Sequence, residues 1–298
     1  MIEVCRLCGS TGELQNSHII PKFVFRWQKK TSPTGYLRTG RTVDRRQQDG
    51  FTQKMLCVNC EGDFSFVENR FKINIFDNAT QKRQSKFSYD SWLSRFALSV
   101  VWRATQMEQF EATLSPKLDA QSKALLDIAV LHWRRQLLGE AKNYGRFPLH
   151  IFEHWQLHDA QHKAIPGNWN RYLNRHSVIR LVKNEPTALF LVYVKMGPVT
   201  VFGQISKPKK KWEGTRINTI KGFYNSAKVR LPADIFHLYM HEAQYHLDLV
   251  SSASEKQMDI ISETFLKDIS KATGSESWAD LVADATRFGG NAFIPKKA

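Results

Sequence analysis

CRLC (residues 5–8) and CVNCEGDFSFVENRF (residues 57–71) are the two stretches that decide the fold of this chain. They hold all four cysteines, in two Cys-x2-Cys pairs: Cys5, Cys8, Cys57 and Cys60. Each pair presents two thiolates on one turn, and two pairs complete a tetrahedral site whose usual occupant is Zn²⁺. The sequence therefore predicts a structural zinc site. The alternatives are two redox pairs or disulfides, and disulfides need an oxidising compartment.

The second cysteine pair leads directly into a helical pattern. Phe64, Val67 and Phe71 recur at i, i+3 and i+7, which places them on one helical face. A cysteine turn, a β-hairpin and a helix that begins at a second cysteine turn form the treble-clef arrangement. We expect this arrangement in the N-terminal part of the chain.

Length and composition indicate a folded protein of two domains. The chain has 298 residues, 42% of them apolar and 24% charged, as in ordinary globular proteins. We expect an α+β fold, with an N-terminal zinc module at residues 1–86 and a mostly helical domain with a small antiparallel sheet at residues 87–298. A membrane span needs about 20 apolar residues, and no such run occurs. Without a secretory signal pattern at its start, the chain is expected in the cytoplasm.

The charge of the chain favours a polyanionic partner. Lysine and arginine number 43 against 28 acidic residues, which gives a net charge of +15. Nucleic acid is the commonest partner of such proteins, and an anionic membrane surface is the second choice.

Between the cysteine pairs lies NSHIIPK, residues 16–22. This segment, with both cysteine pairs in the same order, resembles the HNH endonuclease family over about the first 70–85 residues. The resemblance implies a ββα-metal fold that hydrolyses phosphodiester bonds. His18 would be the general base, and Glu61 would bind a catalytic Mg²⁺ or Mn²⁺ ion. Glu68, seven residues on, would orient His18 or a metal-bound water.

Two positions depart from the family pattern. Ser17 stands where an acidic residue or histidine often supplies a second metal ligand, and no asparagine occurs between His18 and Cys57. These departures favour the alternative function, a non-catalytic zinc-stabilised protein that binds DNA or RNA.

A basic segment separates the two cysteine pairs. Pro33, Gly35 and Gly40 indicate that it forms loops, and basic loops of this kind contact phosphates without reading sequence. Double-stranded DNA is the expected ligand, and a solvated basic loop is the alternative. The residues expected to contact phosphate are Lys22, Arg38, Arg41, Arg45 and Arg46.

The rest of the chain alternates between helical and strand patterns. We expect a helical hairpin, with helix starts at residues 88–90 and 115–116, then three strands and three helices. The expected strands are 178–182, 188–194 and 199–205, and the expected helices are 232–250, 254–269 and 277–288. Extra nucleic-acid surface, homodimer formation and regulation by a ligand or partner all stay open for this region.

Two histidine sets carry no enzymatic motif. The first is spaced at i+4 and predicts a short, partly exposed helix: His150, His154, His158 and His162. In the second set, His246 lies one residue too far from His241 for the His-Glu-x-x-His zinc motif, which excludes a zincin site.

Overall fold

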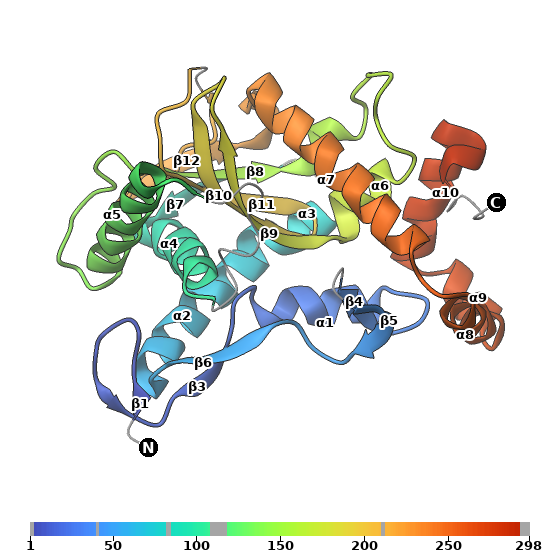
Figure 1. The fold of residues 1–298 in the computed structure, drawn as a ribbon, viewed down its shortest axis with the longest axis horizontal. Helices are drawn as coiled ribbons and strands as arrows, with labels where there is room; N and C mark the ends of the chain where they lie inside the picture. Colours follow the sequence, from blue (N-terminus) through green and yellow to red (C-terminus); the bar gives the residue numbers. More distant parts are fainter. Residues whose placement is uncertain (1–2, 40–41, 82–84, 108–117, 210–211, 293–298) are drawn as a thin grey trace. The chain divides into compact units, whose positions relative to one another are not determined.

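The computed structural model describes residues 3–39, 42–81, 85–107, 118–209 and 212–292 (Figure 1). Small antiparallel sheets combine with helices, which confirms the α+β class. Contacts divide the chain into two compact units. Unit 1 comprises Met1–Pro21, Phe51–Trp155 and Ser177–Pro232, and unit 2 comprises Lys22–Gly50, Gln156–His176 and Ala233–Ala298. The predicted domain boundary at 86/87 coincides with no boundary between these two units, and it stays a prediction.

Unit 1 begins with two short strand pairs and a helix. The pairs are β1 (Glu3–Val4) with β2 (Thr11–Gly12), and β3 (Gln15–His18) with β6 (Thr52–Leu56), both antiparallel. Helix α2 (Val58–Phe71) follows and continues through a π-helical turn (Lys72–Phe76) into α3 (Asp77–Thr80). Phe64, Val67 and Phe71 are buried, which confirms the predicted apolar face. The treble-clef assignment stays a prediction.

The main sheet of unit 1 has four antiparallel strands in the order β8-β11-β10-β9. Their bounds are Leu149–Glu153 for β8, Ser177–Asn184 for β9, Leu189–Met196 for β10 and Val199–Gln204 for β11. The predicted three-strand meander is thereby confirmed. A helix over the first histidine set is wrong, because β8 contains His150 and pairs with β11. All five side chains of β8 are buried, so tertiary packing overrides the i+4 spacing.

Two long helices, α4 (Ser91–Thr105) and α5 (Ala120–Leu137), accompany this sheet in unit 1 (Figure 1). Gly203 permits the close approach of strand β11 to helix α4, because a Cβ atom at this position would lie 2.5 Å from Val101 of α4. The predicted helix start at 88–90 is confirmed at Asp90, the N-cap residue of α4, although the residues before it are not helical. Residues Lys86–Asp90 form strand β7, which pairs with β12 (Lys221–Asn225).

Capping residues fix where the two helices begin. The Asp90 carboxylate accepts a hydrogen bond from the Trp92 backbone nitrogen (3.0 Å) at the start of α4. Helix α5 is capped in the same way by Asp119, through the Ser122 backbone nitrogen (2.8 Å). The predicted start at 115–116 lies outside the described residues. A short 3₁₀ turn follows β8 at His154–Leu157, and another follows β12 at Ser226–Lys228.

Unit 2 is mostly helical. Its elements are α1 (Lys22–Lys30), β4 (Leu37–Thr39), β5 (Thr42–Gln47), α6 (Trp169–Arg175), α7 (Ala233–Ser251), α8 (Glu255–Leu266), α9 (Ile269–Thr273), α10 (Glu276–Phe288) and a 3₁₀ turn (Gly289–Ala292). The three predicted C-terminal helices are confirmed as α7, α8 and α10. The predicted loop is wrong for residues 22–30, where Val24 and Gln28 are buried on the inner face of a helix. Buried Asp284 of α10 accepts a hydrogen bond from Arg171 Nε of α6 (2.8 Å).

One buried carboxyl group of unit 1 has a shifted pKa. Glu153, at the end of β8, is only 1% exposed, and burial raises its pKa to about 7.

Within the described ranges, no helix combines the length and hydropathy that crossing a membrane requires.

Candidate functional site

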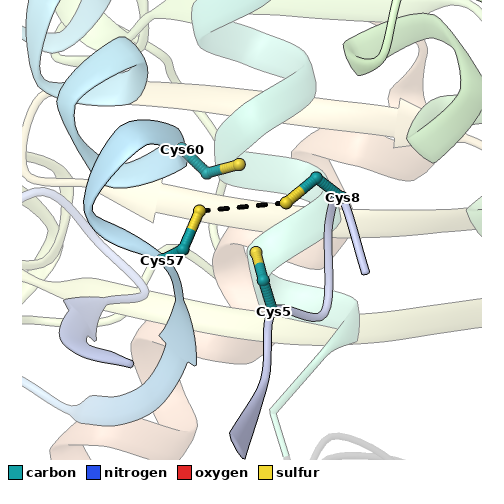
Figure 2. Close-up of side chains that lie close together, drawn as sticks. All are labelled: Cys5, Cys8, Cys57 and Cys60. Carbon is teal, nitrogen blue, oxygen red and sulfur yellow. Dashed lines mark hydrogen bonds between the residues drawn. The ribbon is translucent and has the colours of Figure 1, made fainter. Parts of the chain in front are cut away.

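The four cysteines come together in unit 1 (Figure 2). Their sulfur atoms all lie within 4.8 Å of one another, and Cys8 Sγ lies 3.8 Å from Cys57 Sγ. Cys5 is buried, Cys8 is exposed, and the other two are half-buried. In the part of the chain that the structure describes, this cluster is the one group of three or more histidine, cysteine or acidic side chains that could hold a metal ion such as zinc.

Local backbone geometry positions each cysteine pair. The first pair lies on a tight turn, in which the Gly9 nitrogen donates to the Cys5 carbonyl (2.9 Å) and Gly9 has φ = +79°. Glycine adopts this left-handed conformation without steric cost. A hydrogen bond from the Arg6 nitrogen to the Met55 carbonyl (3.0 Å) ties the turn to β6. Cys57 is the N-cap residue of α2, so the second pair lies on the first turn of that helix.

The thiols of the cluster differ in acidity. A hydrogen bond from the Ser10 hydroxyl lowers the pKa of Cys8 to about 6, and the Sγ–Oγ distance is 3.1 Å. The Cys60 backbone nitrogen lowers the pKa of Cys57. Burial raises the pKa of Cys60 above its ordinary value. The Cys8 thiol is thus close to a thiolate near neutral pH, the form that binds metal.

A second polar site lies between β3 and α2. The Ser17 hydroxyl, which is fully buried, donates to Glu61 Oε2 at 2.7 Å. His18 is the next residue and the last of β3, and its side chain is half-buried. Consecutive side chains leave a strand on opposite faces, so the direct neighbour of Glu61 from this strand is Ser17. The predicted convergence of His18 and Glu61 on one ion stays a prediction.

Glu68 has a different partner from Glu61. Arg103 Nη2 of α4 donates to Glu68 Oε1 at 2.5 Å, and Arg103 Nη1 donates to the backbone carbonyl of His18 at 2.7 Å. Arg103 is 1% exposed, and its guanidinium carbon lies 5.4 Å from the centre of the Phe64 ring. Glu68 is therefore linked to the backbone of His18 through one buried arginine.

The predicted phosphate-contacting residues belong to unit 2. Arg46 donates to Thr264 of α8 (3.1 Å) and lies 4.5 Å from the Tyr36 ring, while burial and Arg46 lower the pKa of half-buried Arg38. Lys22 lies 3.6 Å from Asp49. Arg45 is exposed, and Arg41 lies outside the described residues.

Sequence reasoning missed Arg103 altogether and treated Ser17 only as a departure from a pattern. Arg103 stands in VVWRAT (residues 100–105), a lone charge within an apolar stretch of a helix. Such a charge is either exposed to solvent or, if it is buried, paired with another group. A buried partner was therefore one of the two possibilities that the sequence indicated. The identity of that partner depends on tertiary contacts that no local pattern records.

No protein-family model, curated protein or solved structure matches this chain. Its function is therefore inferred from the geometry of the residues described above.

Proposed function

We propose that this protein is a zinc-stabilised, metal-dependent HNH-like endonuclease. The observation that supports this most directly is the 2.7 Å contact between Ser17 and Glu61. In the pattern that the sequence resembles, the residue before the base and the residue after the second cysteine pair hold the catalytic ion. Here those two positions are adjacent in space.

The cysteine cluster fits zinc. Four sulfurs at about 2.3 Å from one ion in a tetrahedron lie about 3.8 Å from each other. The Cys8–Cys57 distance is 3.8 Å, and no sulfur pair in the cluster exceeds 4.8 Å. A thiolate-only site of this kind is closed, so the zinc would stabilise the structure and leave catalysis to other residues.

The catalytic residues would act beside this zinc. Glu61 and Ser17 supply the oxygen atoms that a hard divalent cation prefers, and Mg²⁺ typically binds one or two carboxylates together with substrate phosphate. When bound, such an ion stabilises the charge that develops on the leaving oxygen. The imidazole of His18 would take a proton from the attacking water.

The partner would be double-stranded DNA, held through its phosphates. The net charge of +15 favours a polyanion. In unit 2, exposed Arg45 and Lys22 remain candidates for phosphate contacts. Arg38 and Arg46 contribute positive charge while they also contact other residues of unit 2.

Plasmid cleavage tests this proposal. Supercoiled DNA is incubated with zinc-loaded wild type, His18→Ala and Glu61→Gln, with Mg²⁺ or Mn²⁺. Loss of a general base typically costs 10²–10⁴-fold in rate, so we expect His18→Ala to be at least about 100-fold slower. His241→Ala is the matched control, because His241 is 76% exposed and lies on α7. Equal rates for His18→Ala and His241→Ala would exclude His18 as the base.

A second candidate function is zinc-stabilised binding of DNA or RNA without cleavage. The observation that favours it is Ser17 itself, because a hydroxyl is a weaker metal ligand than a carboxylate and here donates to Glu61. If wild type binds DNA with a strong salt dependence but cleaves neither DNA nor RNA with either metal, this function replaces the first. A ligand-regulated nuclease would instead gain cleavage when cell extract is added.

A further inference from the structure

Arg103 is a buried cation on a helix that is otherwise almost wholly apolar on its inner face. It lies on α4 near the end of the run from Trp92 to Ala104, and only 1% of it is exposed. A guanidinium withdrawn from water is strongly unfavourable unless charge and hydrogen bonds compensate. A buried arginine therefore indicates that its partners need its positive charge and its hydrogen bonds.

Three acceptors from three elements satisfy this guanidinium. Nη1 donates to the His18 carbonyl at the end of β3 (2.7 Å), and Nη2 donates to Glu68 of α2 (2.5 Å). Nε donates to the Ser99 carbonyl one turn earlier on α4 (3.2 Å). A planar fork can hold several acceptors in fixed directions at once, which a lysine ammonium cannot do.

We infer that Arg103 is a positioning residue for His18, with Glu68 as the anion that fixes its orientation; this inference rests on the proposed nuclease function. Arg103 fixes the main chain of His18, and therefore the place from which the imidazole projects. Glu68 acts on the same residue through Arg103. This role differs from direct contact of Glu68 with the imidazole or with a metal-bound water.

The chain offers a matched control between the same two helices. Arg95 of α4 donates to Asp63 of α2 (3.2 Å) and to the Leu137 carbonyl (3.0 Å). This pair also joins an arginine of α4 to a carboxylate of α2, but neither of these two hydrogen bonds of Arg95 involves β3. Arg95→Lys therefore reproduces the loss of a guanidinium between α2 and α4 without the loss of the His18 contact.

The test compares Arg103→Lys with Arg95→Lys in zinc-loaded protein. For DNA cleavage we expect kcat of Arg103→Lys to fall by about 10- to 100-fold, since small misplacements of a reacting group cost up to about 100-fold. KM should stay within about twofold, and Arg95→Lys should match wild type in both constants. A rise in KM without a fall in kcat, or equal kcat values for the two variants, would overturn the inference.

A second readout does not depend on cleavage. In protein labelled with ¹⁵N-histidine, the ring signals of His18, assigned by their absence in His18→Gln, should shift in Arg103→Lys and stay in place in Arg95→Lys. Unshifted His18 signals in a folded Arg103→Lys protein would overturn the inference even if wild type cleaves DNA. Absence of cleavage by wild type, with shifted signals, would refute the proposed function and leave the positioning role intact.

Glu68→Gln keeps the inference testable if Arg103→Lys does not fold. It preserves the size of the side chain and the Arg103–His18 contact but removes the negative charge that orients the guanidinium. We expect the same changes in kcat and in the His18 signals, at smaller amplitude. A Glu68→Gln protein identical to wild type in both readouts would overturn the role given to Glu68 and Arg103.

Discussion

Replacing Glu153 by glutamine should change how the stability of this protein depends on pH. Glu153 lies at the end of β8, is 1% exposed, and has a pKa that burial raises from 4.5 to about 7. A carboxyl group with a raised pKa in the folded state holds its proton more tightly there than in the unfolded chain. Its stabilising contribution is therefore complete below pH 4.5 and is lost as the pH rises through 7.

The size of the effect follows from this shift. One pKa unit corresponds to about 1.4 kcal/mol, and integrating the proton linkage from pH 5 to pH 8 gives about 2.5 kcal/mol. Glutamine cannot ionise, so the variant lacks this pH dependence. The unfolding free energy of Glu153→Gln minus that of wild type should therefore be about 2.5 kcal/mol larger at pH 8 than at pH 5.

Urea unfolding followed by tryptophan fluorescence measures this difference. Comparing variant with wild type at each pH cancels contributions from the cysteine cluster and from other titrating groups. The steric cost of the amide also cancels, because it is the same at both pH values. Glu140→Gln, at an exposed glutamate, is the control and should show no such change between pH 5 and pH 8. A stability difference for Glu153→Gln that is constant within about 0.5 kcal/mol would refute the reasoning.

The remaining predictions concern the metal sites, the DNA surface and a buried histidine. Metal analysis should find one zinc per chain, and chelation or Cys60→Ser should lower the melting temperature by several degrees or more; a chain that keeps its melting temperature without metal would contradict this. Ser17→Asp should strengthen Mn²⁺ binding measured by calorimetry, whereas Ser17→Ala should not; equal affinities would exclude position 17 from the metal shell. Arg45→Ala should weaken DNA binding for all sequences and reduce the slope of log K against log salt by about one, and an unchanged slope would remove Arg45 from the phosphate contacts. Burial lowers the pKa of His150 to about 4, so its contribution to stability is present above pH 6.5 and is lost as the pH falls toward 4; His150→Gln should therefore lose less stability than wild type between pH 7 and pH 4.5.

Local patterns predicted the elements whose signals are local. The two Cys-x2-Cys pairs and the i, i+3, i+7 spacing of Phe64, Val67 and Phe71 identified the cysteine cluster and helix α2. The three strands of the meander are β-branched and aromatic runs between turns, and they pair as expected. These features depend on residues close in sequence.

The elements that the sequence did not predict correctly are those whose structure depends on residues far away in the sequence. The helix start at Asp90 was predicted, but the strand before it, residues 86–90, was not, because β12, more than 130 residues later, supplies its hydrogen bonds. His150 belongs to a strand because β11 pairs with it, although the histidine spacing favoured a helix. In the candidate site, Glu61 and His18 were proposed from the residues next to them in the sequence, and their roles stay predictions. The Ser17–Glu61 contact and the role of Arg103 depend on how α2, α4 and β3 meet, which the sequence does not state.

The proposed nuclease function requires that a divalent ion binds beside His18 and Glu61. Paramagnetic Mn²⁺, added in small amounts to zinc-loaded protein labelled with ¹⁵N-histidine, measures this directly. We expect that the ring signals of His18 broaden first, that those of exposed His241 do not, and that Glu61→Gln abolishes the effect. His18 signals that stay sharp while Mn²⁺ broadens other residues, or that broaden equally in Glu61→Gln, would contradict it.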